Sequence, residues 1–432
     1  MNKGKAALYL GGILVAAGLL AGKWTLPVLF SPDRHIDSLV AVLAIELVQL
    51  TAVGAGLYLL MRRPYLPGRE VSLVVISTIF SLLLLESGSR IWLDYLATDD
   101  QARRYRLAAE VDPVNRQWSP HHYLNYYPTP SYRSGKKAHN SLGYRGREFS
   151  VEKPDGTFRI VVLGGSTTYT IAVEDNEKTF TRQLENILRD SYGYEAVEVI
   201  NAGAGGYSSW ESLINLEFRV LDLDPDLVII YHGTNDVHTR LVEPGSYRGD
   251  NSGRRRQWSA PPVPLLIKYS YLSRIVSSKL NLDLFRREGL GSFVNAPTYQ
   301  GAGSDNSSAD PLALLEEHQP VFFRRNLANM VAIARANGVE VLLSTWAYSP
   351  YFDDYVSEPH YQRGFHESNA VVNEVARQYG AKLFDFAEKM PGDRKYWSDG
   401  RHVNEEGALV KASLFANYIH NSGVMYARNT TK

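Results

Sequence analysis

The strongest constraint on the fold is an alternation of strand-like and helix-like segments between residues 158 and 418. A strand buried on both faces reads as a short apolar run, whereas an amphipathic helix repeats apolar residues every three to four positions. The expected strands are Ile160–Leu163, Val197–Ile200, Leu227–Tyr231, Val339–Ser344 and Lys382–Phe386, and the expected helices are Phe180–Asp190, Trp210–Leu221, Val321–Asn337, Glu367–Tyr379 and Glu405–Tyr418. This alternation predicts a central parallel sheet between two helical layers, a three-layer α/β sandwich.

Four short blocks place polar residues or glycines where expected strands end or where helices begin. Ser166 follows a glycine turn after the first strand, Gly206 lies in the glycine-rich turn after the second, and Asn235 follows the third. Asp399 and His402 stand three residues apart in the loop before the last helix. Because the carboxyl ends of parallel strands share one edge of a sheet, we expect these residues to lie close together.

These residue types suit nucleophilic catalysis, although each block alone has a simpler explanation. A hydroxyl at a strand-turn-helix junction is exposed as a nucleophile, and an Asp–His pair orients an imidazole as its base. A glycine turn also cradles phosphates or closes a βα unit, and Asn, Asp or an Asp–His pair also caps helices. The occurrence of all four blocks in one chain favours the catalytic interpretation.

In these blocks the sequence resembles the SGNH (GDSL-type) hydrolases, serine esterases and acylhydrolases with a flavodoxin-like α/β fold. The resemblance implies that Ser166 is the nucleophile, His402 its base and Asp399 the partner of the base. It also implies that Gly206 and Asn235 join the Ser166 backbone N–H in an oxyanion hole.

The resemblance extends from about Phe158 to Tyr418, with one departure. The family's usual Gly-Asp-Ser opening reads Gly164-Gly165-Ser166 here, which concerns the substrate more than the chemistry. The preceding segment Asn140–Arg145 also resembles a segment of some membrane-attached members, and a turn with an exposed arginine explains it equally well.

The composition argues against several other classes of protein. There is no Walker-type phosphate loop, no dinucleotide fingerprint, no cysteine and no recognisable histidine spacing for a metal, so we expect no cofactor and no metal ion. The 46 basic and 46 acidic residues give a formal net charge of zero, which argues against a nucleic-acid partner. We interpret the short run Arg254–Arg256 as a solvated loop.

Three apolar runs at the N-terminus predict membrane helices at about residues 6–26, 39–61 and 71–93, within a membrane region spanning 1–96. A cleaved signal peptide explains the first run alone but not the other two. Basic residues before the first helix and between the second and third place those segments in the cytoplasm, so three crossings put the rest of the chain outside. We therefore expect an integral protein of the bacterial inner membrane whose catalytic domain faces the periplasm or the exterior.

The remaining chain divides into an irregular linker at 97–157 that packs on the catalytic domain, and a hydrolase domain at 158–432 with a long insertion at about 238–318. In the insertion we expect a helix over Pro264–Leu284, disorder over Gly301–Ala309 and a position near the site, as a lid or partner surface. After the fourth strand, Trp346 and Tyr348 are candidates for stacking on substrate, or else they cover apolar surface beneath the insertion.

Together these features predict a membrane-anchored serine esterase that acts on an acylated, most simply O-acetylated, glycan or lipid of the cell envelope. One alternative is an O-acyltransferase of an extracytoplasmic polysaccharide, because the same triad passes its acyl group to a sugar hydroxyl when water is excluded. A noncatalytic protein that binds glycan or organises an assembly on the same fold is the other. The membrane helices also offer surface to an envelope assembly partner, and the sequence leaves the oligomeric state open.

Overall fold

The computed structural model describes residues 5–22, 25–26, 39–98, 101, 105–106, 117–124, 126–242, 245–255, 265–279 and 310–425. Contacts within the chain divide it into two compact units. The helical unit comprises Met1–Val111 and Ser259–Thr298, and the sheet unit comprises Asp112–Trp258 and Tyr299–Lys432.

The sheet unit contains the expected alternation of strands and helices. Its main strands are β5 (Phe158–Gly164), β6 (Val197–Gly203), β7 (Leu227–Tyr231), β8 (Glu340–Ser344) and β9 (Lys382–Phe384). Its helices are α6 (Ser166–Tyr169), α7 (Phe180–Asp190), α8 (Ser209–Asn215), α9 (Thr234–Arg240), α10 (Ser252–Arg255), α13 (Pro311–Glu317), α14 (Val321–Ala336), α15 (Pro359–Tyr379), α16 (Phe386–Lys389) and α17 (Glu405–Asn421). Single turns lie at Asn176–Lys178 (η4), Leu216–Val220 (η5), Leu221–Leu223 (η6), Tyr355–Ser357 (η8) and Arg394–Tyr396 (η9).

The five main strands form one parallel sheet in the order β6-β5-β7-β8-β9. The chain order along the sheet is therefore 2-1-3-4-5, the flavodoxin-like arrangement, and the predicted fold class is confirmed. The order changes direction at β5, so the turn after β5 lies between the carboxyl ends of β6 and β7. Polar residues in these three turns are consequently neighbours in space.

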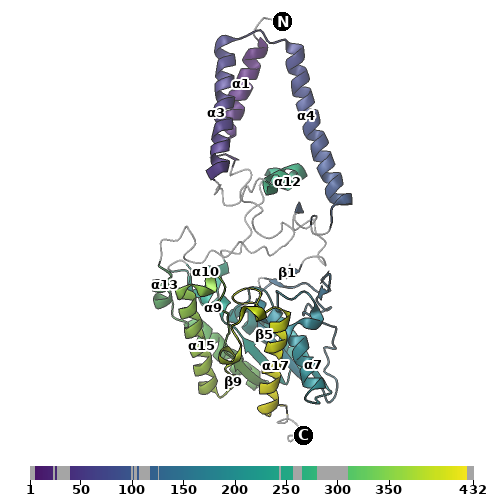
Figure 1. Ribbon diagram of the computed structural model, residues 1–432, viewed down its shortest axis with the longest axis vertical. Helices are drawn as coiled ribbons and strands as arrows, with labels where there is room; N and C mark the ends of the chain where they lie inside the picture. The colour runs from purple at the N-terminus through teal and green to yellow at the C-terminus, as the bar shows by residue number, and fades with distance from the viewer. Residues whose placement is uncertain are drawn as a thin grey trace. The chain divides into compact units, whose positions relative to one another are not determined.

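Alternating residues of each strand supply two hydrophobic cores. On one face, Ile160 and Val162 of β5 pack in the core that contains α7 and α17, which lie side by side in Figure 1. On the other face, Val161 and Leu163 pack in the core formed with α14 and part of α15. The buried strands are nearly continuous apolar runs because both of their faces are covered by helices.

The segment before β5 has more regular structure than the expected irregular linker. Strand β1 (Trp118–Pro120) pairs antiparallel with β2 (Tyr126–Pro128), and β3 (Arg133–Ser134) pairs with β4 (Lys137–Ala138). The hydroxyl of Tyr126 donates a hydrogen bond to the carbonyl of Gly205, so this segment contacts the turn that follows β6.

The helical unit contains α1 (Lys5–Leu20), α3 (Leu39–Arg62), α4 (Gly68–Ile91) with a π turn, η1 (Trp92–Leu96), α11 (Leu265–Tyr269) and α12 (Tyr271–Lys279). Among the described residues, two helices are long and apolar enough to cross a membrane, Val42–Arg62 and Gly68–Leu96. Helix α1 has 16 described residues, fewer than the roughly 20 that a crossing needs, and the first of the three expected spans stays a prediction.

The carboxyl end of α4 holds the helices of the insertion. Glu86 pairs with Arg90 at 2.8 Å, as their spacing predicts, and its carboxylate also accepts the Tyr271 and Leu272 amides at 3.0 Å. The helix expected over Pro264–Leu284 is thus two helices that break at Ser270, where Glu86 caps the second one. Residues 280–284 and the segment Gly301–Ala309 lie outside the described residues.

Candidate active site

The turn after β5 presents the Ser166 hydroxyl to the imidazole of His402. Strand β5 ends at Gly164, Gly165 precedes the helix, and Ser166 is the first residue of α6, where the backbone N–H has no partner within the helix. Ser166 is partly exposed, and its Oγ lies 2.8 Å from Nε2 of His402. The two residues are 236 positions apart in the sequence, so the fold brings them together.

Asp399 holds the imidazole from its other side. Its Oδ2 lies 2.8 Å from Nδ1 of His402, while its Oδ1 accepts the backbone N–H groups of Arg401 at 2.9 Å and His402 at 2.7 Å. Asp354 fixes the same loop, because its carboxylate accepts the N–H of Gly400 at 2.9 Å. Immediately afterwards, the Asn404 side chain caps the start of α17.

The electrostatics of the pair suit an imidazole that accepts a proton at neutral pH. Burial lowers the pKa of His402 below its ordinary 6.5, and the hydrogen bond and charge of Asp399 offset this only in part. For Asp399, burial raises the pKa, but the hydrogen bond and charge of His402, followed by the charge of Arg401, hold it well below the ordinary 3.8. At pH 7 the carboxyl is therefore ionised and the imidazole is neutral.

Asn235, at the start of α9, and Gly206, in the turn after β6, belong to the two connections that flank the Ser166 turn. The Asn235 side chain donates from Nδ2 to the carbonyl of Tyr207 at 2.8 Å, which uses one of its two protons. A Cβ at position 165 would lie 2.6 Å from this Nδ2, so Gly165 makes room for the carboxamide. Gly206 has φ of 81°, a left-handed conformation that glycine adopts readily.

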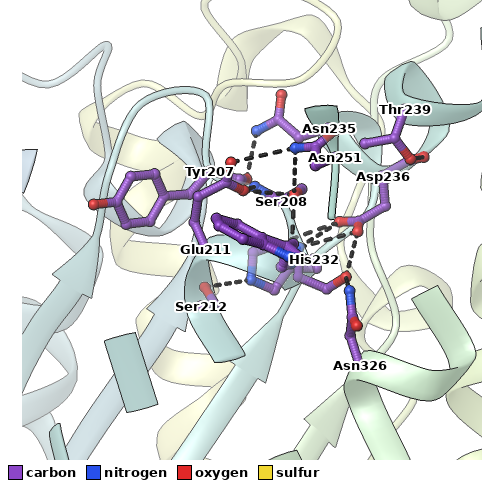
Figure 2. Close-up of polar contacts among 12 residues, drawn as sticks. Tyr207, Ser208, Glu211, Ser212, His232, Asn235, Asp236, Thr239, Asn251 and Asn326 are labelled. Carbon is purple, nitrogen blue, oxygen red and sulfur yellow. Dashed lines mark hydrogen bonds and ion pairs between the residues drawn. The ribbon is translucent and has the colours of Figure 1, made fainter. Parts of the chain in front are cut away.

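A buried polar network connects the start of α8, the start of α9 and helix α14 next to these residues (Figure 2). Asp236 accepts hydrogen bonds from the amide of Ser209 at 3.0 Å and from its hydroxyl at 2.6 Å, and Asn326 of α14 donates to the same hydroxyl at 3.0 Å. One residue earlier, Ser208 and Glu211 form a capping box at the start of α8. Burial raises the pKa of Asp236 to about 7, despite the lowering effect of the Ser209 hydrogen bonds.

Two buried basic side chains hold the segment that begins at Ser166, a role that sequence reasoning identified for neither of them. Lys411 of α17 is fully buried, donates to the carbonyl of Thr167 at 3.2 Å and lies 3.8 Å from the centroid of the Tyr231 ring. Arg145 donates to the carbonyls of Tyr169 at 3.0 Å and Thr170 at 2.8 Å. Arg145 is only 3% exposed, so the alternative explanation of Asn140–Arg145, a turn with an exposed arginine, is wrong.

The two candidate substrate residues differ in their surroundings. Trp346 is 1% exposed and packs against Phe365, because the absence of a side chain at Gly233 lets the indole fill that space. An indole with almost no surface has none to offer a sugar ring, so for Trp346 the structure agrees with the alternative of covering apolar surface. Tyr348 is partly exposed, and its contact with substrate stays a prediction.

Within the described parts of the chain, no group of three or more His, Cys, Asp or Glu side chains is placed to hold a metal ion. The arrangement around Ser166 is that of a hydroxyl, a neutral imidazole and a carboxylate in sequence. It can activate the hydroxyl as a nucleophile without a metal ion.

Comparison with known proteins gave one family and several solved structures. Residues 162–410, more than half of the chain, match the GDSL-like lipase/acylhydrolase family. No curated protein matches the chain significantly. A solved GDSL-like lipase from Bacteroides thetaiotaomicron is 16% identical, over 61% of this chain and 88% of that one, with a TM-score of 0.35.

Two further solved structures have comparable similarity. The lipase/acylhydrolase from Enterococcus faecalis is 20% identical over 62% of this chain and 97% of its own, with a TM-score of 0.37. An acetyl xylan esterase is 15% identical over 61% of this chain and 100% of its own, with a TM-score of 0.38.

Proposed function

The chain belongs to the GDSL-like lipase/acylhydrolase family, and from that premise we propose that it is a membrane-anchored serine esterase with the triad Ser166, His402 and Asp399. The observation that carries the proposal is the continuous chain of hydrogen bonds from the hydroxyl through the imidazole to the carboxylate, with 2.8 Å at each link. A buried, neutral imidazole between those two partners has the geometry and the protonation state of a general base.

In the proposed reaction, His402 takes the proton of Ser166 as Oγ attacks an ester carbonyl, and the carbonyl oxygen becomes an oxyanion. The amides of Ser166 and Gly206 and the Nδ2 group of Asn235 donate to that oxyanion. The imidazolium then gives its proton to the leaving alcohol, and an acyl-serine remains. Water, deprotonated by His402, attacks the acyl-serine and releases the acid and the free serine.

The helical unit supports a membrane anchor. Apolar side chains are exposed along α4, for example Val74, Phe80 and Leu83, each at 60% or more, and a soluble protein rarely exposes such a continuous surface. The end of α3, the loop after it and the start of α4 carry Arg62, Arg63 and Arg69, which favours a cytoplasmic position for this connection. Helix α4 then leads out of the cytoplasm whether or not α1 crosses, and the sheet unit faces the periplasm or the cell exterior.

An outward-facing esterase tethered to the inner membrane is placed among the glycans and lipids of the envelope. We therefore propose that its substrate is an O-acylated envelope glycan or lipid and that the acyl group is acetyl. A series of 4-nitrophenyl esters of increasing chain length tests the acyl group, and acetyl should give the highest kcat/KM. A preference for long chains would contradict the acetyl assignment and favour a lipid substrate.

A fluorophosphonate probe tests the esterase proposal directly on the full chain in detergent. Wild type should be labelled, Ser166→Ala should not, and Ser150→Ala, at a serine outside the site, should be labelled like wild type. Absence of labelling in folded wild-type protein would contradict the proposal and favour a glycan-binding protein.

Transfer of the acyl group to a sugar hydroxyl is distinguished by its product. A donor ester with labelled acetyl should release label to water in the presence or absence of an oligosaccharide acceptor. Label that appears mainly on the oligosaccharide would identify an O-acyltransferase.

The orientation of the protein in the membrane is tested by adding protease to spheroplasts. The protease should digest the sheet unit, and full protection of that unit would reverse the proposed topology.

A further inference from the structure

The insertion after α9 returns to the candidate site and is fixed there by contacts within the sheet unit. Arg325 of α14 donates to the carbonyl of Gly249 at 2.6 Å, and the Tyr247 ring packs on Phe322 of the same helix. Two residues after Gly249, the Asn251 side chain donates to the Ser208 hydroxyl at 3.3 Å, a contact drawn in Figure 2. The segment that leads into α10 is thus held against the turn that follows β6.

Arg254 of α10 reaches from this segment to Asn235. One guanidinium nitrogen donates to the backbone carbonyl of Asn235 at 2.9 Å, and the other donates to its side-chain Oδ1 at 3.2 Å. Arg254 is 3% exposed. The expectation that Arg254–Arg256 is a solvated charge run is therefore wrong at its first residue, because this guanidinium is buried against the site.

The two contacts of the Asn235 carboxamide fix which way it points. Arginine only donates hydrogen bonds and a backbone carbonyl only accepts them, so Oδ1 must face Arg254 and Nδ2 must face the carbonyl of Tyr207. If the amide flipped, Oδ1 would meet that carbonyl and Nδ2 would meet the guanidinium, and both contacts would become repulsive. The guanidinium thereby keeps the donor end of the carboxamide at Gly165, the residue that precedes Ser166.

We propose that Arg254 is a positioning residue for the oxyanion hole, which it serves by orienting and polarising the Asn235 carboxamide from the insertion. This inference rests on the proposed esterase function. The positive charge at Oδ1 draws electron density from the amide, so Nδ2–H is a stronger donor to a developing oxyanion. Because the donor is needed most in the transition state, loss of Arg254 should lower kcat and leave KM nearly unchanged.

The first test is Arg254→Met, which removes the positive charge and both guanidinium donors but keeps a side chain of similar length. We expect kcat for 4-nitrophenyl acetate to fall about tenfold to a hundredfold, with less effect from Arg254→Lys, which keeps one charged donor. Arg248, exposed on the same segment, supplies the control Arg248→Met, which should match wild type. Wild-type kcat in Arg254→Met would overturn the inference.

A double-mutant cycle distinguishes positioning from a general structural role. In an Asn235→Ala background, Arg254→Met should change kcat by less than about twofold, because the carboxamide on which it acts is absent. A loss as large as in wild type would mean that Arg254 does not act through Asn235. If thermal unfolding shows that Arg254→Met does not fold, Arg254→Lys takes its place in the cycle, with the same criterion.

Fluorophosphonate labelling separates this inference from the proposed function. Unlabelled wild-type protein would contradict the esterase proposal itself. Wild-type protein that is labelled, a Ser166→Ala variant that is not, and an Arg254→Met variant labelled at the wild-type rate would leave the esterase proposal standing and refute the role of Arg254.

Discussion

Replacing Asp399 by asparagine should convert the imidazole of His402 to the wrong tautomer. The backbone N–H groups of Arg401 and His402 both donate to Oδ1 of Asp399, so the oxygen of an asparagine must occupy that position. Its NH2 group then replaces Oδ2 and donates to Nδ1 of His402. An imidazole that accepts at Nδ1 carries its proton on Nε2, and it can no longer take the proton of Ser166.

The expected loss is about 10⁴-fold in kcat, which corresponds to about 5.5 kcal/mol in the activation barrier. The productive tautomer of the variant carries its proton on Nδ1 of His402. That N–H would then face the NH2 group of the asparagine, and the repulsion between the two donors makes this tautomer rare. KM should change little, because Asp399 acts on substrate only through His402. Ser166→Ala and His402→Ala should lose more, on the order of 10⁶-fold.

Steady-state hydrolysis of 4-nitrophenyl acetate at saturating substrate measures this loss, and the rate of fluorophosphonate labelling should fall in parallel. Asp155→Asn, at an exposed carboxylate, is the matched control and should retain wild-type kcat. If Asp399→Asn kept more than about a tenth of wild-type kcat, Asp399 would not be the residue that sets the tautomer.

Four further outcomes follow from the same contacts. Because burial lowers the pKa of His402, kcat/KM should rise with pH to a plateau, and a midpoint above pH 6.5 would contradict this. Gly165→Ala should lower kcat about tenfold, since its Cβ would lie 2.6 Å from Nδ2 of Asn235, and a crystal structure should show that amide displaced. The raised pKa of Asp236, about 7, means that the folded state holds this proton more tightly than the unfolded state, so its contribution to stability is lost as pH rises through about 7. Asp236→Asn should therefore gain melting temperature relative to wild type between about pH 5 and about pH 8, and an unchanged difference would refute this assignment. Glu86→Ala should release the amides at the start of α12, and hydrogen exchange at Tyr271 and Leu272 should then be faster than in wild type.

Most of the sheet could be predicted from the sequence because its signals are local. Strand β7 and helix α7 have the predicted bounds, since a continuous apolar run and a regular amphipathic repeat each identify their element without reference to the rest of the chain. Helix α15 begins at Pro359, earlier than its apolar pattern indicates, because proline at the first turn needs no backbone donor. The convergence of the four blocks follows from parallel topology, which brings the carboxyl ends of the strands to one edge.

The partners of the buried basic side chains could not be predicted, because nothing local in the sequence identifies them. Arg254 begins a run of three arginines, and only the path of the insertion decides that this one is buried beside Asn235. Lys411 occupies an ordinary position of a helix, and its aromatic surroundings come from α7, β7 and α16. The break at Ser270 has the same origin, because the carboxylate that caps α12 belongs to Glu86, which is 184 residues away.

Gly165, which replaces the aspartate of the family's usual Gly-Asp-Ser segment, and the buried Arg254 have one structural explanation. A side chain at position 165 would meet both Nδ2 of Asn235, at 2.6 Å, and the carbonyl of Tyr207, at 3.0 Å. Those two atoms are joined by a hydrogen bond, and Arg254 holds the far end of the same carboxamide. A side chain at position 165 would therefore displace the Asn235 carboxamide from the position in which Tyr207 and Arg254 hold it. Gly165 and Arg254 therefore contact opposite ends of one carboxamide, and we expect a change at either position to weaken the donor that we propose for the oxyanion hole.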